Sequence, residues 1–131
     1  MRILEMMPSQ LELVDGFVSS LLKRIPQLNE DKDTLFNIKL ALHEAIINAV
    51  KHGNKMNRNL PVQVDIKKEE EQVIIQVKDQ GDGFDYKNLP DPITPENIEK
   101  LNGRGLFLIQ NAMDRVEYAD GGRIIKMVKF L

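Results

Sequence analysis

The spacing of hydrophobic and polar residues along the chain predicts strands in three regions. Between residues 62 and 77 apolar and polar positions alternate on either side of a charged turn at 68–71, a pattern typical of a β-hairpin. A short strand is predicted at 2–7, where Pro8 follows. Two closing strands are predicted at 115–118 and 124–130, paired across the turn Asp120-Gly121-Gly122.

Other stretches of the chain follow the period of a helix. Apolar residues recur at three- and four-residue steps up to about residue 24, and Ser9 and Glu12 have capping-box spacing, so we place an N-cap at Ser9. A second helix is predicted from about Asp33 to Gly53, with cap candidates at 29–33, and a third at 105–113. The segment 86–102 contains three prolines and little periodicity, which predicts a long loop of the kind that often forms a lid.

The order of these elements defines the fold class. Strands and helices do not alternate regularly, so a doubly wound parallel sheet is not expected. We predict an α+β two-layer sandwich, in which a mixed, mostly antiparallel sheet carries helices on one face. The length of 131 residues suits a single domain spanning 1–131.

Composition narrows the classes of function. The net charge is −2 and no long block carries one sign of charge, which argues against general nucleic-acid binding. The chain has no Cys and two His, so a reducing cytoplasm is the expected compartment and a disulfide framework is excluded. No apolar stretch approaches 18 residues, so neither a membrane span nor an export signal is predicted.

A narrow polar strip runs along the second predicted helix, opposite its apolar face. It consists of Glu44, Asn48, Lys51 and Lys55, and apolar residues flank it closely. A helix that forms one wall of a pocket would have such a strip, but so would a surface helix with a Glu44–Asn48 hydrogen bond. Both interpretations are open from the strip alone. Its amide, carboxylate and ammonium groups suit Mg²⁺, a proton and a phosphate respectively.

The first of two glycine turns follows the predicted hairpin, at residues 79–84. Asp79 stands at the strand end, where its carboxylate can accept a hydrogen bond from an exocyclic amine such as that of adenine. Gly81 and Gly83 allow the backbone to approach a flat ligand or to adopt positive φ, and Phe84 closes the segment. By itself this segment is more typical of a structural Asp/Gly turn, which is common after strands.

The second glycine turn, residues 103–106, opens the third predicted helix. Its free amides and the helix dipole can hold phosphate oxygens. Neither glycine turn is a P-loop or a dinucleotide-binding fingerprint, so those two nucleotide folds are excluded. The specific signal is the ordered set: a Glu-x-x-x-Asn helix, Asp-x-Gly-x-Gly after a hairpin, and Gly-x-Gly-Leu after a long loop.

In this order the three segments resemble the sequence boxes of the GHKL ATPase superfamily. The likeness is closest to its small stand-alone anti-sigma-factor serine/threonine kinases. Residues 42–53 look like the N box, and the two glycine turns are similar to the two glycine boxes. The resemblance covers nearly the whole chain. It implies a Bergerat fold, with Mg²⁺ and ATP held between the second helix, the lid and the glycine turns.

The resemblance also implies roles for single residues. Asn48 would ligate Mg²⁺, Asp79 would bind adenine, and Glu44 would be the general base that takes the proton from a protein hydroxyl. Further nucleotide contacts would come from Lys51, Gly81, Gly83, Phe84, Gly103, Arg104, Gly105, Leu106 and Phe107.

One position departs from the family pattern. Relatives often carry a Thr after a glycine near the C-terminal strand, where it helps to hold adenine, but here Arg123 follows Gly121-Gly122. We therefore expect either that adenine binding depends more heavily on Asp79 and water, or that the affinity for nucleotide is weak.

The resemblance implies a kinase that phosphorylates a small antagonist protein and sequesters a sigma factor, and that commonly forms a homodimer. A second interpretation is an ATP-dependent binding module that switches without catalytic turnover. A third is an α+β domain that binds no nucleotide and whose glycine turns are structural.

Overall fold

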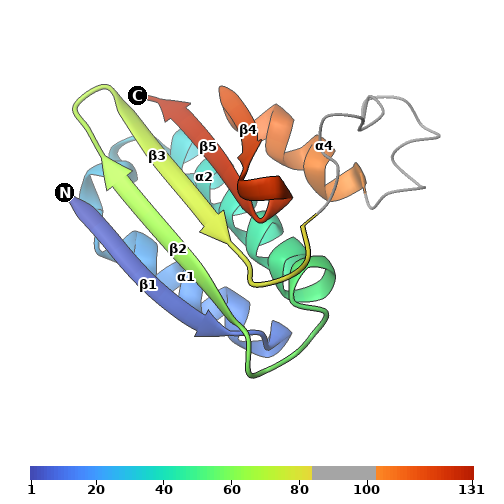
Figure 1. The fold of residues 1–131 in the computed structure, drawn as a ribbon. Helices are drawn as coiled ribbons and strands as arrows, with labels where there is room; N and C mark the ends of the chain where they lie inside the picture. The colour runs from blue at the N-terminus through green and yellow to red at the C-terminus, as the bar shows by residue number, and fades with distance from the viewer. Residues whose placement is uncertain (84–102) are drawn as a thin grey trace.

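The computed structural model describes residues 1–83 and 103–131, which form one sheet covered by helices on one face (Figure 1). The strands are β1 (Arg2–Pro8), β2 (Pro61–Lys68), β3 (Gln72–Lys78), β4 (Arg115–Ala119) and β5 (Ile124–Phe130). The α-helices are α1 (Val14–Lys23), α2 (Lys32–Asn48) and α4 (Gly103–Ala112). A π-helical turn, Ala49–Gly53, continues α2, and 3-10 turns occupy Leu11–Leu13, Pro26–Glu30 and Asp120–Gly122. The predicted lid and Phe84 lie outside the described residues.

Within the described residues the five strands form one sheet in the order β1-β2-β3-β5-β4, with all four pairings antiparallel, so the sheet is wholly antiparallel there and not mixed as predicted. The apolar residues that alternate with polar ones in the hairpin all lie on the face that the helices cover. Each of them is at most 2% exposed: Val62, Val64, Ile66, Val73, Ile75 and Val77. This arrangement confirms the α+β two-layer sandwich and its largely antiparallel sheet.

Helices α1 and α2 fill the space behind the sheet with their apolar faces. From α2 the core receives Ile38, Ala41, Leu42, Ala45 and Ile46, none more than 2% exposed. Leu40 and Ile47 are half-buried and pack against the same core. The apolar flanks expected around the polar strip are therefore present. Within the described ranges, no helix is both long enough and apolar enough to cross a membrane.

The N-cap predicted at Ser9 is wrong. Ser9 is buried, and its Oγ donates to the carbonyl of Leu60 at 2.6 Å instead of accepting from the following turn. The helical segment begins only at Leu11, after Gln10, whose side chain makes no capping hydrogen bond. A long-range contact thus takes the hydroxyl that the local spacing assigned to a cap.

The beginning of α2 was predicted correctly. Asp31 lies within the expected cap range, and its carboxylate accepts from the amides of Asp33 and Thr34 at 3.0 and 3.2 Å. These bonds, above all those from Thr34, hold the pKa of Asp31 below its ordinary value. Two of the free amides at the helix start are satisfied in this way.

The end of α2 differs from the regular helix that we predicted to run to about Gly53. The α-helical hydrogen bonding ends at Asn48, and the π-helical turn carries the chain to Gly53. Asn54 keeps a right-handed conformation, and the left-handed residues are Lys55 and Met56, with φ of 52° and 63°. Because a π turn contains an extra residue, Lys51 and Lys55 leave the line that a regular helix would give them.

Candidate functional site

Glu44 and Asn48 meet the first turn of α4. Both side chains are half-buried, and Gly105 of α4 lies directly against them. A Cβ atom on Gly105 would come within 3.2 Å of Asn48 Nδ2 and 3.3 Å of Glu44 Oε2, closer than nearly all real Cβ contacts. The glycine therefore allows the amide and the carboxylate to lie beneath the helix terminus. Two of the three predicted segments are joined here.

The start of α4 offers backbone amides near this pair. Gly103 is its first residue, so the amides of the second glycine turn belong to the unbonded first turn of the helix. Leu106 and Phe107 follow as half-buried positions, and Ile109, which is fully buried, anchors the helix to the core. The side chain of Arg104 is not among those described.

Lys51 lies in the π-helical turn that follows Asn48. Its side chain is exposed and has no hydrogen bond or ion pair with any other described residue. The structure therefore does not join it to the Glu44–Asn48 pair. An ammonium group in this state remains available to an anionic ligand.

Asp79 lies one residue beyond β3 with its carboxyl group turned inward. The residue is only 9% exposed, and Oδ1 accepts from the amide of Gly81 at 2.8 Å. Burial raises the pKa of Asp79, while the Gly81 amide and the charge of Arg123 oppose that rise. Asp120 adds a smaller repulsion. Asp79 Oδ2 has no hydrogen bond with any other described residue, so this buried carboxylate can accept a directed hydrogen bond from a ligand.

Gly53 and Gly81 allow Asp79 to lie against the π-helical turn that continues α2. A Cβ on Gly53 would overlap the carboxyl group of Asp79, and a Cβ on Gly81 would overlap the carbonyl oxygen of Gly53. The π-helical turn and the first glycine turn thus pack backbone to backbone. Asp79 packs against the π-helical turn at Gly53, and Gly105 packs against Glu44 and Asn48 of α2. All three predicted segments therefore meet along α2 and its π-helical continuation.

Asn54, which no sequence pattern marked as a site residue, connects the site to the sheet by hydrogen bonds. Its amide nitrogen donates to Ser9 Oγ at 2.9 Å and to the carbonyls of Leu60 and Pro61, each at 3.1 Å. Its oxygen accepts from the amide of Gln80 at 2.6 Å. Asn54 is only 2% exposed, so these bonds form in the protein interior. The only local signal was its place after Gly53, which is equally typical of an ordinary helix end.

Replacing Asn54 with Ala should lower the free energy of unfolding by about 2–3 kcal/mol, because it removes the hydrogen bonds of a buried side chain and leaves the part-buried Gln80 amide and Pro61 carbonyl without this partner. Urea denaturation followed by circular dichroism measures the loss. Asn59→Ala is the matched control, since Asn59 is exposed and its side chain has no hydrogen bond with the described residues. Equal stability of the two variants would contradict the role given to Asn54.

Arg123 is the second residue whose role the sequence did not reveal. Its backbone carbonyl accepts from the amide of Asp79 at 3.0 Å, and its side chain reaches back to the first glycine turn. The sequence pattern marked this position only by the missing Thr.

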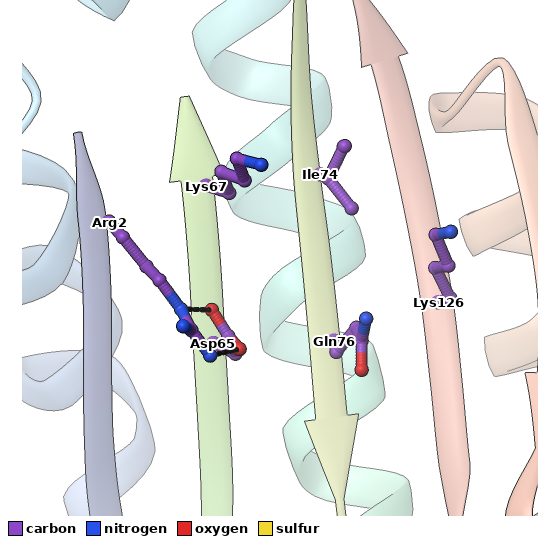
Figure 2. Close-up of a pocket in the computed structure, with 6 residues that line it drawn as sticks. All are labelled: Arg2, Asp65, Lys67, Ile74, Gln76 and Lys126. Carbon is purple, nitrogen blue, oxygen red and sulfur yellow. Dashed lines mark hydrogen bonds and ion pairs between the residues drawn. The ribbon is translucent and has the colours of Figure 1, made fainter. Parts of the chain in front are cut away.

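An open hollow on the outer face of the sheet contains none of the predicted site residues. Figure 2 shows that it is lined by Arg2, Asp65, Lys67, Ile74, Gln76 and Lys126, with Arg2 and Asp65 in an ion pair of 2.7 Å. Of the three cationic side chains that line the hollow, Arg2 is therefore already neutralised by Asp65. The candidate site lies instead where α2, α4 and the start of the first glycine turn converge.

No group of three or more His, Cys, Asp or Glu side chains that could hold a metal ion occurs in the described part of the chain. A Mg²⁺ ion does not require one, because it retains several waters and takes one or two protein oxygens besides those of a phosphate ligand. The amide oxygen of Asn48 fits that requirement.

The chain is similar to known proteins over most of its length. Residues 4–129 match the family model described as histidine kinase-like ATPase domain. The chain is 40% identical over 108 residues to the serine-protein kinase RsbW of Staphylococcus aureus, in strains JH9 and Newman alike. These alignments cover 76% of this chain and 67% of each relative. All three site segments fall inside the range that the family model matches.

Proposed function

Because the chain belongs to the family of histidine kinase-like ATPase domains, we propose that it is an ATP-dependent serine-protein kinase of the anti-sigma-factor type. The observation that carries the proposal is the meeting of Glu44 and Asn48 with Gly105 at the start of α4. This meeting supports roles for Glu44 as a base, for Asn48 as a metal ligand and for the backbone amides of the second glycine turn as phosphate donors.

In this proposal ATP lies along the N-box helix, with adenine at Asp79 and the phosphates at the start of α4. The exocyclic amine of adenine donates to the free oxygen of Asp79. The phosphates accept from the backbone amides of the second glycine turn. The exposed ammonium group of Lys51, in the turn that follows α2, would add a positive charge. Gly81 and Gly83 let the backbone approach the base.

Asn48 would hold Mg²⁺ through its amide oxygen. When bound, the ion neutralises charge on the β- and γ-phosphates. The half-buried position of Asn48 against Gly105 supports this role, because it fixes the amide beside the helix terminus where the phosphates would lie.

Glu44 would act on the protein substrate. The serine oxygen attacks the γ-phosphorus, the bond from that phosphorus to the bridging oxygen of ADP breaks, and the hydroxyl proton passes to the Glu44 carboxylate. ADP and a phosphoserine are the products. Most of the catalysis in such a transfer is positioning and charge stabilisation, which the glycine turns and Asn48 would provide.

The acceptor in this proposal is a small antagonist protein, and a sigma factor is the partner that the kinase binds and releases. The relatives named serine-protein kinase RsbW support the kinase half, and the resemblance to anti-sigma-factor kinases supports the partners. A cytoplasmic location and a homodimer belong to the same proposal. The absence of Cys supports the location, and the homodimer rests on the resemblance alone.

Incubation of the chain with ATP, Mg²⁺ and candidate antagonist proteins, followed by mass spectrometry, tests the proposal. We expect phosphoserine on one antagonist, and none when EDTA removes the metal. A rise in melting temperature with ATP but no phosphoserine would favour a binding module without turnover. No rise at millimolar ATP would contradict nucleotide binding, because a ligand of the native state must stabilise it.

A further inference from the structure

Arg123, the residue that precedes β5, lies beside the loop that follows β3. In the antiparallel pair of β3 and β5, Lys78 lies opposite Ile124, and one residue further the amide of Asp79 donates to the carbonyl of Arg123 at 3.0 Å. Antiparallel register alone therefore places Arg123 at the start of the first glycine turn.

The guanidinium group of Arg123 binds three backbone carbonyls from two turns. Nε donates to Gly81 at 2.8 Å, Nη2 to Asp82 at 3.1 Å and Nη1 to Asp120 at 3.1 Å. We call these three bonds the Arg123 clamp. A planar fork with five fixed N–H donors can make them together, whereas the compact ammonium group of Lys cannot reach all three.

The two turns that the clamp joins touch each other directly. Gly83 has φ of 79°, and a Cβ there would overlap the carbonyl oxygen of Gly121. Gly121 has φ of 63°, and a Cβ on it would lie 3.0 Å from Arg123 Nη1. The guanidinium thus packs closely against the turn Asp120–Gly122, and this turn and the first glycine turn form one packed unit.

The clamp acts on Asp79 through Gly81. Arg123 holds the carbonyl of Gly81, and the amide of the same residue donates to Asp79 Oδ1 at 2.8 Å. Asp79 Oδ2 has no hydrogen bond with any other described residue. The carboxyl group is therefore fixed by one oxygen, and the second is left for a ligand, a preorganised arrangement that favours tight binding.

We propose that Arg123 is a positioning residue for the nucleobase end of the site: its clamp on the first glycine turn orients Asp79 to accept the exocyclic amine of adenine. This inference rests on the proposed function, because it requires that ATP binds at Asp79. Arg123 stands where relatives often carry Thr, and here it acts through the backbone of Gly81 and Asp82 rather than on the nucleotide.

Three variants of the full chain test the clamp: Arg123→Ala, Arg123→Lys and the control Lys126→Ala, which removes a cation from the strand that follows Arg123. Isothermal calorimetry gives the dissociation constants for ATP and for tripolyphosphate, and hydrogen exchange without nucleotide reports the Gly81 amide. We expect Arg123→Ala to raise the constant for ATP about tenfold, as when a tenth of the molecules hold the binding geometry. Exchange at Gly81 should accelerate, and tripolyphosphate affinity should not change.

Arg123→Lys should resemble Arg123→Ala, since one ammonium group cannot replace the clamp, and Lys126→Ala should match the wild type. If Arg123→Ala fails to fold, Arg123→Lys provides the same comparison. Wild-type protein that binds no ATP would overturn the proposed function and this inference with it. Wild-type binding that Arg123→Ala leaves unchanged would overturn this inference alone. So would equal losses for ATP and tripolyphosphate, or a wild-type affinity of Arg123→Lys for ATP.

Discussion

Glu44→Gln is expected to lower the rate of phosphate transfer to a protein serine by about 10³-fold, the usual contribution of a general base. The amide of Gln has the size of the carboxylate and keeps its contact with Gly105, but it cannot take the hydroxyl proton. ATP binding should persist, because Glu44 has no bonding role toward the nucleotide in the proposed site. Single-turnover transfer of labelled phosphate and calorimetry of ATP binding measure the two quantities separately.

Glu12→Gln is the control for this experiment, because Glu12 is an exposed carboxylate on the 3-10 turn before α1. It should leave both rate and affinity unchanged. A Glu44→Gln variant that transfers phosphate at the wild-type rate would remove Glu44 from the mechanism. A variant that loses ATP binding as well would give Glu44 a binding role instead of a catalytic one.

The strands could be predicted closely because their signal is local. The alternating apolar residues of the hairpin face the core, and a shift by one residue would expose the whole set, so the pattern fixes both position and face. The predicted strand at 2–7 and the observed β1, Arg2–Pro8, differ by one residue. The pairing of β3 with β5 rather than with β4 has no such signal, because it depends on how the chain crosses the sheet.

The helix ends show where local spacing fails. Asp31 caps α2 as its neighbours predict, since its carboxylate lies in solvent and nothing competes for it. Ser9 has an equally good spacing, but its hydroxyl is buried and bonds across the molecule to Leu60 and Asn54. Capping rules describe an isolated helix, so they cannot anticipate a partner 51 residues away in sequence.

The candidate site divides in the same way. The polar strip identified Glu44 and Asn48 because the helix is regular up to Asn48, where a step of 100° per residue holds. Beyond that point the π-helical turn changes the phase, and Lys51 is exposed. Gly53 and Arg123 matter through tertiary contacts with Asp79, which no spacing along the chain reveals. The roles themselves remain predictions, for Phe84 and Arg104 as for the rest.

Asp79 connects the stability of the fold to its proposed function. Because burial raises its pKa in the folded state, ionisation of this carboxyl group is less favourable in the native protein than in the unfolded chain. Its contribution to stability is present at acid pH and is lost as pH rises through the folded-state pKa. At neutral pH the charged Asp79 carboxylate thus lowers the stability of the nucleotide-free protein, although the same charge would bind the adenine amine of a ligand.

Asp79→Asn should therefore separate stability from binding. The Asn oxygen can still accept from Gly81, and without a charge the nucleotide-free variant should melt at or above the wild-type temperature at neutral pH. That advantage should vanish as pH falls below about 3.8, the ordinary value for Asp. The affinity for ATP should fall about 100-fold, because the Asn amino group faces the adenine amine with no acceptor between them. Thermal melting with and without Mg²⁺-ATP, across pH, gives all three results.

Asp82→Asn is the matched control, since Asp82 belongs to the same turn but its side chain is 94% exposed and its contact with Lys55 spans 3.8 Å. It should bind ATP like the wild type and show no gain in stability. An Asp79→Asn variant whose melting temperature rises with ATP as much as that of the wild type would mean that adenine binding does not depend on this carboxylate. A variant destabilised at neutral pH would mean that the Asp79 charge stabilises the turn, against the direction that its burial implies.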